Sequence, residues 1–197
     1  TNYDYLIANA YFKSAVIGGE VKNVEFKDIL LKIKITVADG KSFEHSYRIF
    51  DEDTFNSIGK NAQSSYTADK YYTIMTSLDL ASERTAITNF TGGLQGYNNE
   101  VTIKLNGNNF ATTLGKDAQI RNISFIGNVN AQGFLANENK GTITNVTIDV
   151  NGIEASTLSF EGEAFVGGLV GINSGTIDGG KVLGLSITGQ SIVGGIA

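Results

Sequence analysis

The apolar and polar positions of this chain repeat one short phrase. In each copy a large apolar residue precedes a short polar or glycine-rich stretch, and β-branched residues then follow around an asparagine or a glycine. The spacing between copies is loose, because Asn122 and Asn145 lie 23 residues apart whereas Val166 and Val193 lie 27 apart. The five copies begin at Tyr11, Phe110, Gly133, Val166 and Val193.

Alternation within each copy predicts short strands, since successive strand residues point to opposite faces. Glycine is too frequent for helix. Short strands joined by glycine and asparagine corners, one set per ~20–27 residues, predict a parallel β-solenoid, an all-β fold whose stacked coils share one core. The usual crossover rule makes this β-helix right-handed. Inward asparagines are expected to stack in a ladder, and the predicted structural repeat positions are Asn23, Asn122, Asn145, Gly168, Gly171, Asn173 and Gly175.

Two stretches interrupt the repeat. Residues 33–50 alternate on both sides of Asp39-Gly40, which predicts an inserted β-hairpin. Residues 51–62 predict a short helix with Asp51 or Asp53 as N-cap and Gly59 near its end. We therefore divide the chain into 1–36, the tail of a preceding solenoid block, 37–70, a hairpin and helix junction, and 71–197, a β-helix. The last copy is incomplete at the C-terminus, so we expect a fragment, or an end covered by another segment or chain.

Composition narrows the function classes. The chain has 197 residues, of which 41% are hydrophobic, so it can form one cored domain. A net charge of −5 with 15 basic residues argues against nucleic-acid binding. No apolar run approaches the ~18 residues of a membrane-spanning helix, so no membrane insertion is expected. The absence of cysteine excludes disulfides and thiolate metal sites.

Candidate chemistry is sparse. A protease zinc site needs two histidines one helical turn apart, but His45 is the only histidine, and its position predicts a half-buried hairpin residue. The acidic run 51–53 fits helix capping better than a calcium site or a pair of glycosidase carboxylates. A polysaccharide-active site could draw only on Asp79, Glu83 and Arg84. We predict no catalytic residue, cofactor or metal in this segment.

Three tyrosines, Tyr66, Tyr71 and Tyr72, are the most suggestive binding feature. Tyrosines on an exposed ledge serve as interface anchors. However, Tyr71 opens a predicted strand over 71–75, and a strand buries one residue of each adjacent pair. The pattern therefore favours the core over a contact surface for this cluster.

The fourth copy, Gly168-Leu169-Val170-Gly171-x-Asn173-x-Gly175-x-Ile177, resembles the GLUG repeat of bacterial surface proteins. Residues 72–80, 89–99 and 101–103 are similar to an opening of the form Y-x-L-x-x-D-L-D, F-T-G-T-x-x-G-N-G and an apolar strand, although Ser77 replaces the first aspartate and the second turn is degenerate. In that family such β-helical regions precede the catalytic domain of zinc metalloproteases that cleave immunoglobulin A. Related repeats occur in cell-wall-anchored adhesins.

The resemblance implies an extracellular, secreted or cell-wall-attached protein of a Gram-positive bacterium. We expect a non-catalytic spacer and recognition surface of an immunoglobulin A protease-like metalloprotease, with a host protein such as immunoglobulin, or a glycan, and flanking domains of the same polypeptide as partners. One alternative is an adhesin stalk that binds host protein or glycan. Another is a polysaccharide-active β-helix enzyme.

Overall fold

The computed structural model describes residues 38–60, 65–81, 84–149, 156–162 and 164–197, with the strand backbone of 15–17 and 20–22. The chain divides into two compact units, Thr1–Val37 and Ala38–Ala197. In the first unit, strands β1 (Ala15–Ile17) and β2 (Glu20–Lys22) pair antiparallel. Solenoid coils pair in parallel, so these two strands do not form a coil with each other, and the preceding solenoid block over 1–36 stays a prediction. Asn23 lies outside the described residues.

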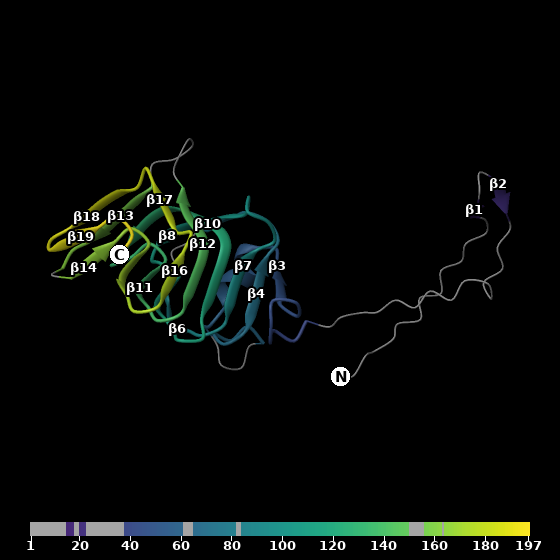
Figure 1. Cartoon of the computed structure of the whole chain (residues 1–197), viewed down its shortest axis with the longest axis horizontal. Helices are drawn as coiled ribbons and strands as arrows, with labels where there is room; N and C mark the ends of the chain where they lie inside the picture. Colours follow the sequence, from purple (N-terminus) through teal and green to yellow (C-terminus); the bar gives the residue numbers. More distant parts are fainter. Residues whose placement is uncertain are drawn as a thin grey trace. The chain divides into compact units, whose positions relative to one another are not determined.

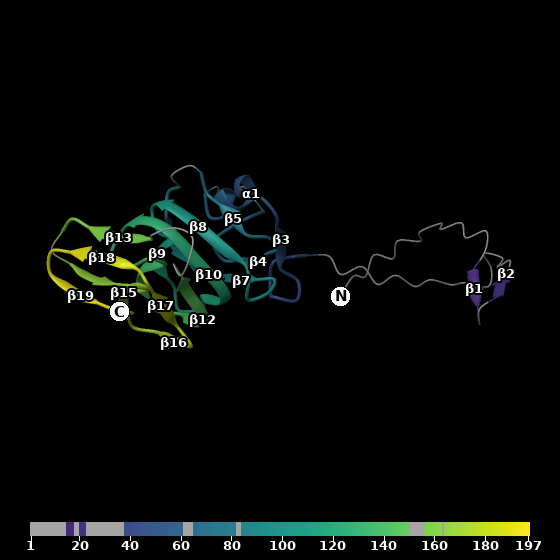
Figure 2. The same cartoon turned by 90° about the horizontal axis from the view of Figure 1, so that it is seen from above.

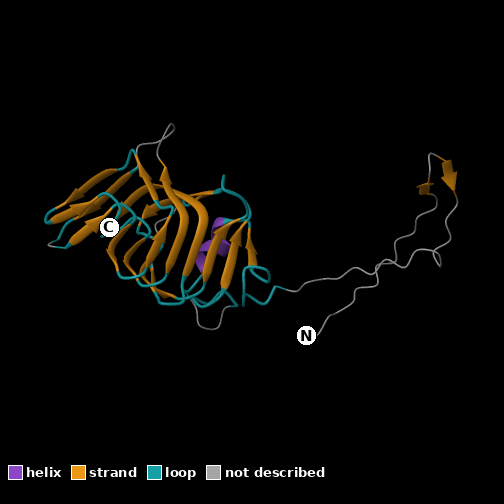
Figure 3. Cartoon of the chain, viewed as in Figure 1, coloured by secondary structure: helices purple, strands orange, loops and turns teal. Residues whose placement is uncertain are grey.

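The second unit is a parallel β-solenoid of about five turns, which confirms the predicted fold (Figure 1). Six parallel strands lie side by side along its first sheet. Figure 3 shows strands over most of the second unit, with a short helix beside the first strands of the sheet. In chain order the strands of this sheet are β3 (Tyr47–Ile49), β4 (Tyr71–Ile74), β7 (Gly93–Gly96), β10 (Gln119–Asn130), β12 (Thr142–Asp149) and β16 (Thr176–Asp178).

Two further faces close each coil (Figure 2). The long strand β10 turns a corner and joins the first face to the second. The second face also contains β5 (Leu78–Asp79), β8 (Thr102–Gly107), β13 (Thr157–Phe160), β17 (Lys181–Leu183) and β18 (Ser186–Gly189). The third contains β6 (Ile87–Phe90), β9 (Ala111–Leu114), β11 (Ala136–Asn139) and β15 (Val170–Asn173). A last parallel pair is β14 (Phe165–Gly167) with β19 (Ile192–Gly194).

The register of the first sheet confirms a loose period. Equivalent positions are Tyr71, Gly93, Gln119, Thr142 and Thr176, which are separated by 22, 26, 23 and 34 residues. Both predicted spacings are true registers. The strand residues on either side of Asn122 pair with those on either side of Asn145, and Val166 pairs with Val193.

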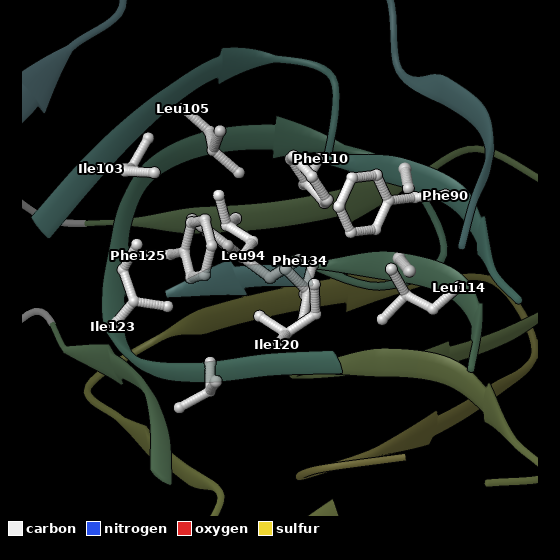
Figure 4. Close-up of a cluster of buried hydrophobic side chains, with 14 of the residues drawn as sticks. Phe90, Leu94, Ile103, Leu105, Phe110, Leu114, Ile120, Ile123, Phe125 and Phe134 are labelled. Atoms are coloured by element: carbon white, nitrogen blue, oxygen red, sulfur yellow. The ribbon is translucent and has the colours of Figure 1, made fainter. Parts of the chain in front are cut away.

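The core is a continuous column of inward side chains (Figure 4). Leu94, Ile120 and Ile143 occupy equivalent positions of successive coils and are fully buried. Phe90, Phe110 and other aromatic side chains fill the wider part of the column. No coil could bury these side chains alone, so the stack itself stabilises the fold.

The predicted short helix is present as α1 (Glu52–Ser57). Asp51 is its N-cap, since Oδ1 accepts the Thr54 N–H at 2.8 Å. These hydrogen bonds from the backbone and side chain of Thr54 hold the pKa of Asp51 below its usual value. Phe55 is fully buried, so the helix contributes to the core beside the first coils. Gly59 follows with a left-handed φ of 74°, a conformation that favours glycine.

The predicted hairpin differs from the structure in its second arm. Its first arm, up to residue 37, lies outside the described residues. The turn around Gly40 is present, with the N–H groups of Asp39 and Gly40 both donating to the carbonyl of His45. Residues 47–49 then pair in parallel with β4, so they form part of the solenoid. The solenoid therefore begins before the predicted residue 71.

The predicted inward position of Asn122 and Asn145 is wrong. Both have left-handed backbone, with φ of 52° and 51°, at a corner where Asn145 is exposed. Their side chains are in ladder contact, since Asn145 Nδ2 donates to Asn122 Oδ1 at 3.4 Å. An inward asparagine that makes the same kind of contact is Asn139, which is fully buried and whose Nδ2 donates to Oδ1 of the exposed Asn173 at 2.8 Å. Asparagine is favoured at a corner with left-handed backbone and also in an inward ladder, so its presence in the sequence does not distinguish the two positions.

The glycines of the fourth copy are required by close packing between coils. A Cβ on Gly168 would lie 2.1 Å from the carbonyl oxygen of Gly195, and one on Gly175 would lie 2.2 Å from that of Gly141. Gly171 is similarly crowded by the neighbouring coil. The repeat glycines therefore mark the places where backbone meets backbone.

Candidate functional site

The outer face of the first sheet carries the most organised set of polar side chains. Alternate residues of β3, β4, β7 and β10 point away from the core. One line of equivalent outward positions is Arg48, Thr73, Gln95 and Arg121, which we call the polar row. Gln95 Nε2 donates to Thr73 Oγ1 at 3.0 Å, and Arg121 Nε donates to Gln95 Oε1 at 2.9 Å. This chain of hydrogen bonds joins three coils and fixes the side chains before any ligand arrives.

A second line, the apolar row, consists of Phe50, Met75 and Tyr97. Each of the three directly follows one of the paired residues Ile49, Ile74 and Gly96. The backbone hydrogen bonds between neighbouring strands continue through these three residues. Met75 N–H donates to the Ile49 carbonyl at 2.9 Å and Tyr97 N–H to the Ile74 carbonyl at 2.8 Å. Phe50 is 60% exposed and Tyr97 64% exposed. Two large aromatic side chains therefore lie in water on a backbone held by strand pairing.

A loop over residues 38–46 packs against the same face. The Phe43 ring meets Tyr71 edge-on at 4.9 Å, and the Arg121 guanidinium lies 3.7 Å from the centre of the Phe43 ring. Gln119 Nε2 donates to the Tyr71 hydroxyl at 3.2 Å. Gly93 lies beneath this cluster, where a Cβ would come within 2.3 Å of Tyr71. The loop thus fixes the position of Arg121.

The predicted tyrosine cluster is divided by the structure. Tyr72 is fully buried, its hydroxyl donates to the Thr67 carbonyl at 2.6 Å, and burial raises its pKa. Tyr66 is half-buried and packs against Tyr72 and Tyr47, with ring centroids at 6.2 and 5.4 Å. Tyr71 alone lies on the outer face. The core therefore takes Tyr72, and Tyr66 packs against the edge of that core.

The candidates for polysaccharide chemistry do not gather in the described residues. Asp79 is exposed and pairs with Lys104 at 3.4 Å, whereas Glu83 lies outside the described residues. Arg84 is 1% exposed, with its guanidinium 4.8 Å from the centre of the Phe55 ring and 5.4 Å from that of Phe110. None of its guanidinium nitrogens has a hydrogen-bond partner among the described residues, and burial lowers its pKa to about 10.

The remaining titratable candidates have local structural roles. Asp51 caps α1, and Asp53 is exposed in its first turn. His45 is half-buried, as predicted, but lies in the turn rather than in a strand. Within the part of the chain that the structure describes, no group of three or more histidine, aspartate or glutamate side chains is placed to hold a metal ion.

The sequence reasoning missed the outer face as a unit. The alternation pattern places Arg48 and Phe50 in a separate hairpin, and this placement hides their alignment with Thr73 and Met75. The available signal was the spacing of 25 residues from Ile49 to Ile74 and 22 from Ile74 to Gly96, which matches the repeat. If the repeat is extended toward the N-terminus, into the predicted junction over 37–70, the residues of the polar row and of the apolar row align.

Comparisons with known proteins leave the family open. The chain matches no protein-family model, and it has no significant match among curated proteins or solved structures. The resemblance to GLUG-repeat proteins therefore stays a prediction. Among the described residues, no helix is long and apolar enough to cross a membrane.

Proposed function

We propose that this chain is a non-catalytic β-solenoid of a secreted or cell-wall-attached bacterial protein, which acts as a rigid spacer and presents a recognition surface. The first sheet carries this proposal. Its six strands are paired in register over one continuous core, and each turn adds about 4.8 Å of length. Such a stack resists bending because every coil is bonded to its neighbours.

The placement of acidic and basic side chains also favours a non-catalytic role. Asp79 lies on the outside of the coil wall and Arg84 lies inside it. General acid and base catalysis requires groups that reach one substrate atom together. These two side chains cannot do so while the coil is intact.

The parent protein that the repeat resemblance favours is an immunoglobulin A protease-like zinc metalloprotease, with immunoglobulin as the host partner. An adhesin stalk is the second candidate, and the organised outer face of the first sheet favours it. Peptide mapping of the native polypeptide distinguishes the two. An H-E-x-x-H motif with a further glutamate would support the protease, whereas further Gly-Gly-Leu-Val-Gly coils with a wall-sorting signal would support the adhesin.

Hydrogen exchange tests the spacer role. We expect the amides of β7, β10 and β12 to exchange slowly and as one block, because they share the central core. An Ile120→Asp variant, which places a charge in that core, should lose the protection of all three strands together. Exchange of these strands in the wild-type chain as fast as in exposed loops would contradict a rigid spacer.

A further inference from the structure

The outer face of the first sheet combines charge and apolar surface in an unusual way for this chain. The polar row contains Arg48 and Arg121, and neither the polar row nor the apolar row contains a carboxylate along the described strands β3, β4, β7 and β10. The chain as a whole has a net charge of −5. The two guanidinium groups therefore make this face a local site of attraction for an acidic ligand on a chain of net negative charge.

Both guanidinium groups are held in place by their neighbours. Arg48 Nη1 donates to Met75 Sδ at 3.3 Å, which places it beside the apolar row. Arg121 is fixed by Gln95 and by the Phe43 ring. A guanidinium binds a carboxylate through two parallel hydrogen bonds, and groups that are already positioned lose little entropy on binding.

The apolar row supplies flat surfaces beside these charges. Phe50 and Tyr97 are two strands apart, about 10 Å at the usual strand spacing of about 4.8 Å. Aromatic side chains provide rigid contact area at low entropic cost and pack against the C–H faces of sugar rings. The exposed side-chain amides of Asn98 and Asn99, which directly follow Tyr97 in the chain, can hydrogen-bond to sugar hydroxyls.

The size of the face decides between a saccharide and a protein. The two rows across four strands span about 14 by 7 Å between residue positions, or roughly 100 Å² before the side chains are counted. A standard protein interface buries about 800 Å² on each partner. This face is therefore too small to hold a protein by itself, whereas a short oligosaccharide would cover it.

We propose that the outer face of β3, β4, β7 and β10 binds a short acidic oligosaccharide, with sugar rings on Phe50 and Tyr97 and a carboxylate at the exposed Arg48. The proposal rests on the recognition role proposed above and names its ligand class. Sialic acids and uronic acids share the required chemistry, a carboxylate on a sugar ring.

Calorimetric titration of the full chain with two acidic probes, 3′-sialyllactose and trigalacturonate, tests the proposal and separates the two sources. We expect one probe to bind, and its neutral counterpart, lactose or the methyl-esterified trigalacturonate, to bind at least about tenfold more weakly. Affinity should fall about tenfold in Tyr97→Ala, Phe50→Ala and Arg48→Gln. Added sodium chloride should weaken binding further.

Matched controls come from the other end of the solenoid. Phe165→Ala removes an aromatic side chain that is 52% exposed, and Lys181→Gln removes an exposed cation. Both should bind the probe as the wild type does. Wild-type affinity in Tyr97→Ala and Arg48→Gln would overturn the proposal. Failure of both acidic probes to bind would also overturn it, even if the protein bound the acidic peptide poly-glutamate at this face. Hydrogen exchange on the same samples reports the spacer role separately, so either idea can fail alone.

Discussion

The middle coils and the last strands of the solenoid share one sequence pattern but differ in burial. Strand β7 has parallel neighbours on both sides, and its Leu94 is fully buried. In the last strands, the inward Val193 is 45% exposed, whereas its register partner Val166 in the preceding coil is 1% exposed. An inward apolar residue of a solenoid is therefore buried mainly by the adjacent coil and not by the coil to which it belongs. Stability should therefore be concentrated in coils with two neighbours.

The largest contrast is expected for apolar truncations. Leu94→Ala should lower the free energy of unfolding by about 3 kcal/mol, because it leaves a cavity in the central column. Val193→Ala should cost less than about 1 kcal/mol, since that inward side chain lacks the cover that its register partner Val166 has and is already partly hydrated. Urea unfolding followed by circular dichroism measures both. Equal losses in the two variants would mean that burial is uniform along the solenoid.

Glycine substitutions sharpen the comparison between the two regions. A Cβ on Gly92 would lie 1.9 Å from the Lys70 carbonyl oxygen, whereas a Cβ on Gly195 would meet nothing within 4 Å. Gly92→Ala should therefore destabilise the fold by about 2 kcal/mol through overpacking. Gly195→Ala should leave stability unchanged within about 0.5 kcal/mol. If the two variants unfold at the same urea concentration, the close approach of the two coils at Gly92 is not present.

Arg84 tests the interior beside α1. The buried guanidinium of Arg84 has no hydrogen-bond partner among the residues that the structure describes, and such a cation opposes folding at neutral pH, so Arg84→Met should raise the free energy of unfolding by about 1 kcal/mol. Arg84→Lys retains a charge but loses the planar stack on Phe55 and Phe110, and should be less stable than the wild type. A loss of stability in Arg84→Met would show that the guanidinium has partners in solution.

The smallest effect concerns the helix cap. The pKa of Asp51 is lowered in the folded state, so its contribution to stability is present above the unfolded-state pKa and is lost as pH falls through the folded one. Asp51→Ala should lose this acid-dependent contribution, and Asp51→Asn should retain most of the capping at pH 7. Thermal melts at pH 7 and pH 3 measure the difference. An unchanged acid dependence in Asp51→Ala would rule out the cap.

The sequence predicted the fold because spacing carries the register. Asn122 with Asn145, and Val166 with Val193, mark neighbouring positions in the folded stack. At β1 and β2, which pair antiparallel, the same local phrase is less informative, since alternation alone does not separate a hairpin from a coil.

The candidate site was harder to predict because it depends on lateral alignment between coils. Phe50 and Tyr97 are 47 positions apart, and each is unremarkable alone. Their alignment emerges only when residues 47–50 are assigned to the first strand of the sheet. The orientation of Asn122 was missed for a related reason, because a left-handed corner and an inward ladder leave the same residue type in the sequence.

Disulfide trapping tests the parallel register most directly, because the chain contains no cysteine of its own. Thr142 and Thr176 are exposed register partners on adjacent strands, about 5 Å apart at the usual strand spacing and so within disulfide range. Thr142→Cys with Thr176→Cys should form an intramolecular disulfide quickly under mild oxidation. Thr142→Cys with Asp178→Cys, displaced by two residues, should not. Rapid closure of the displaced pair, or failure of the register pair in a folded chain, would contradict the solenoid.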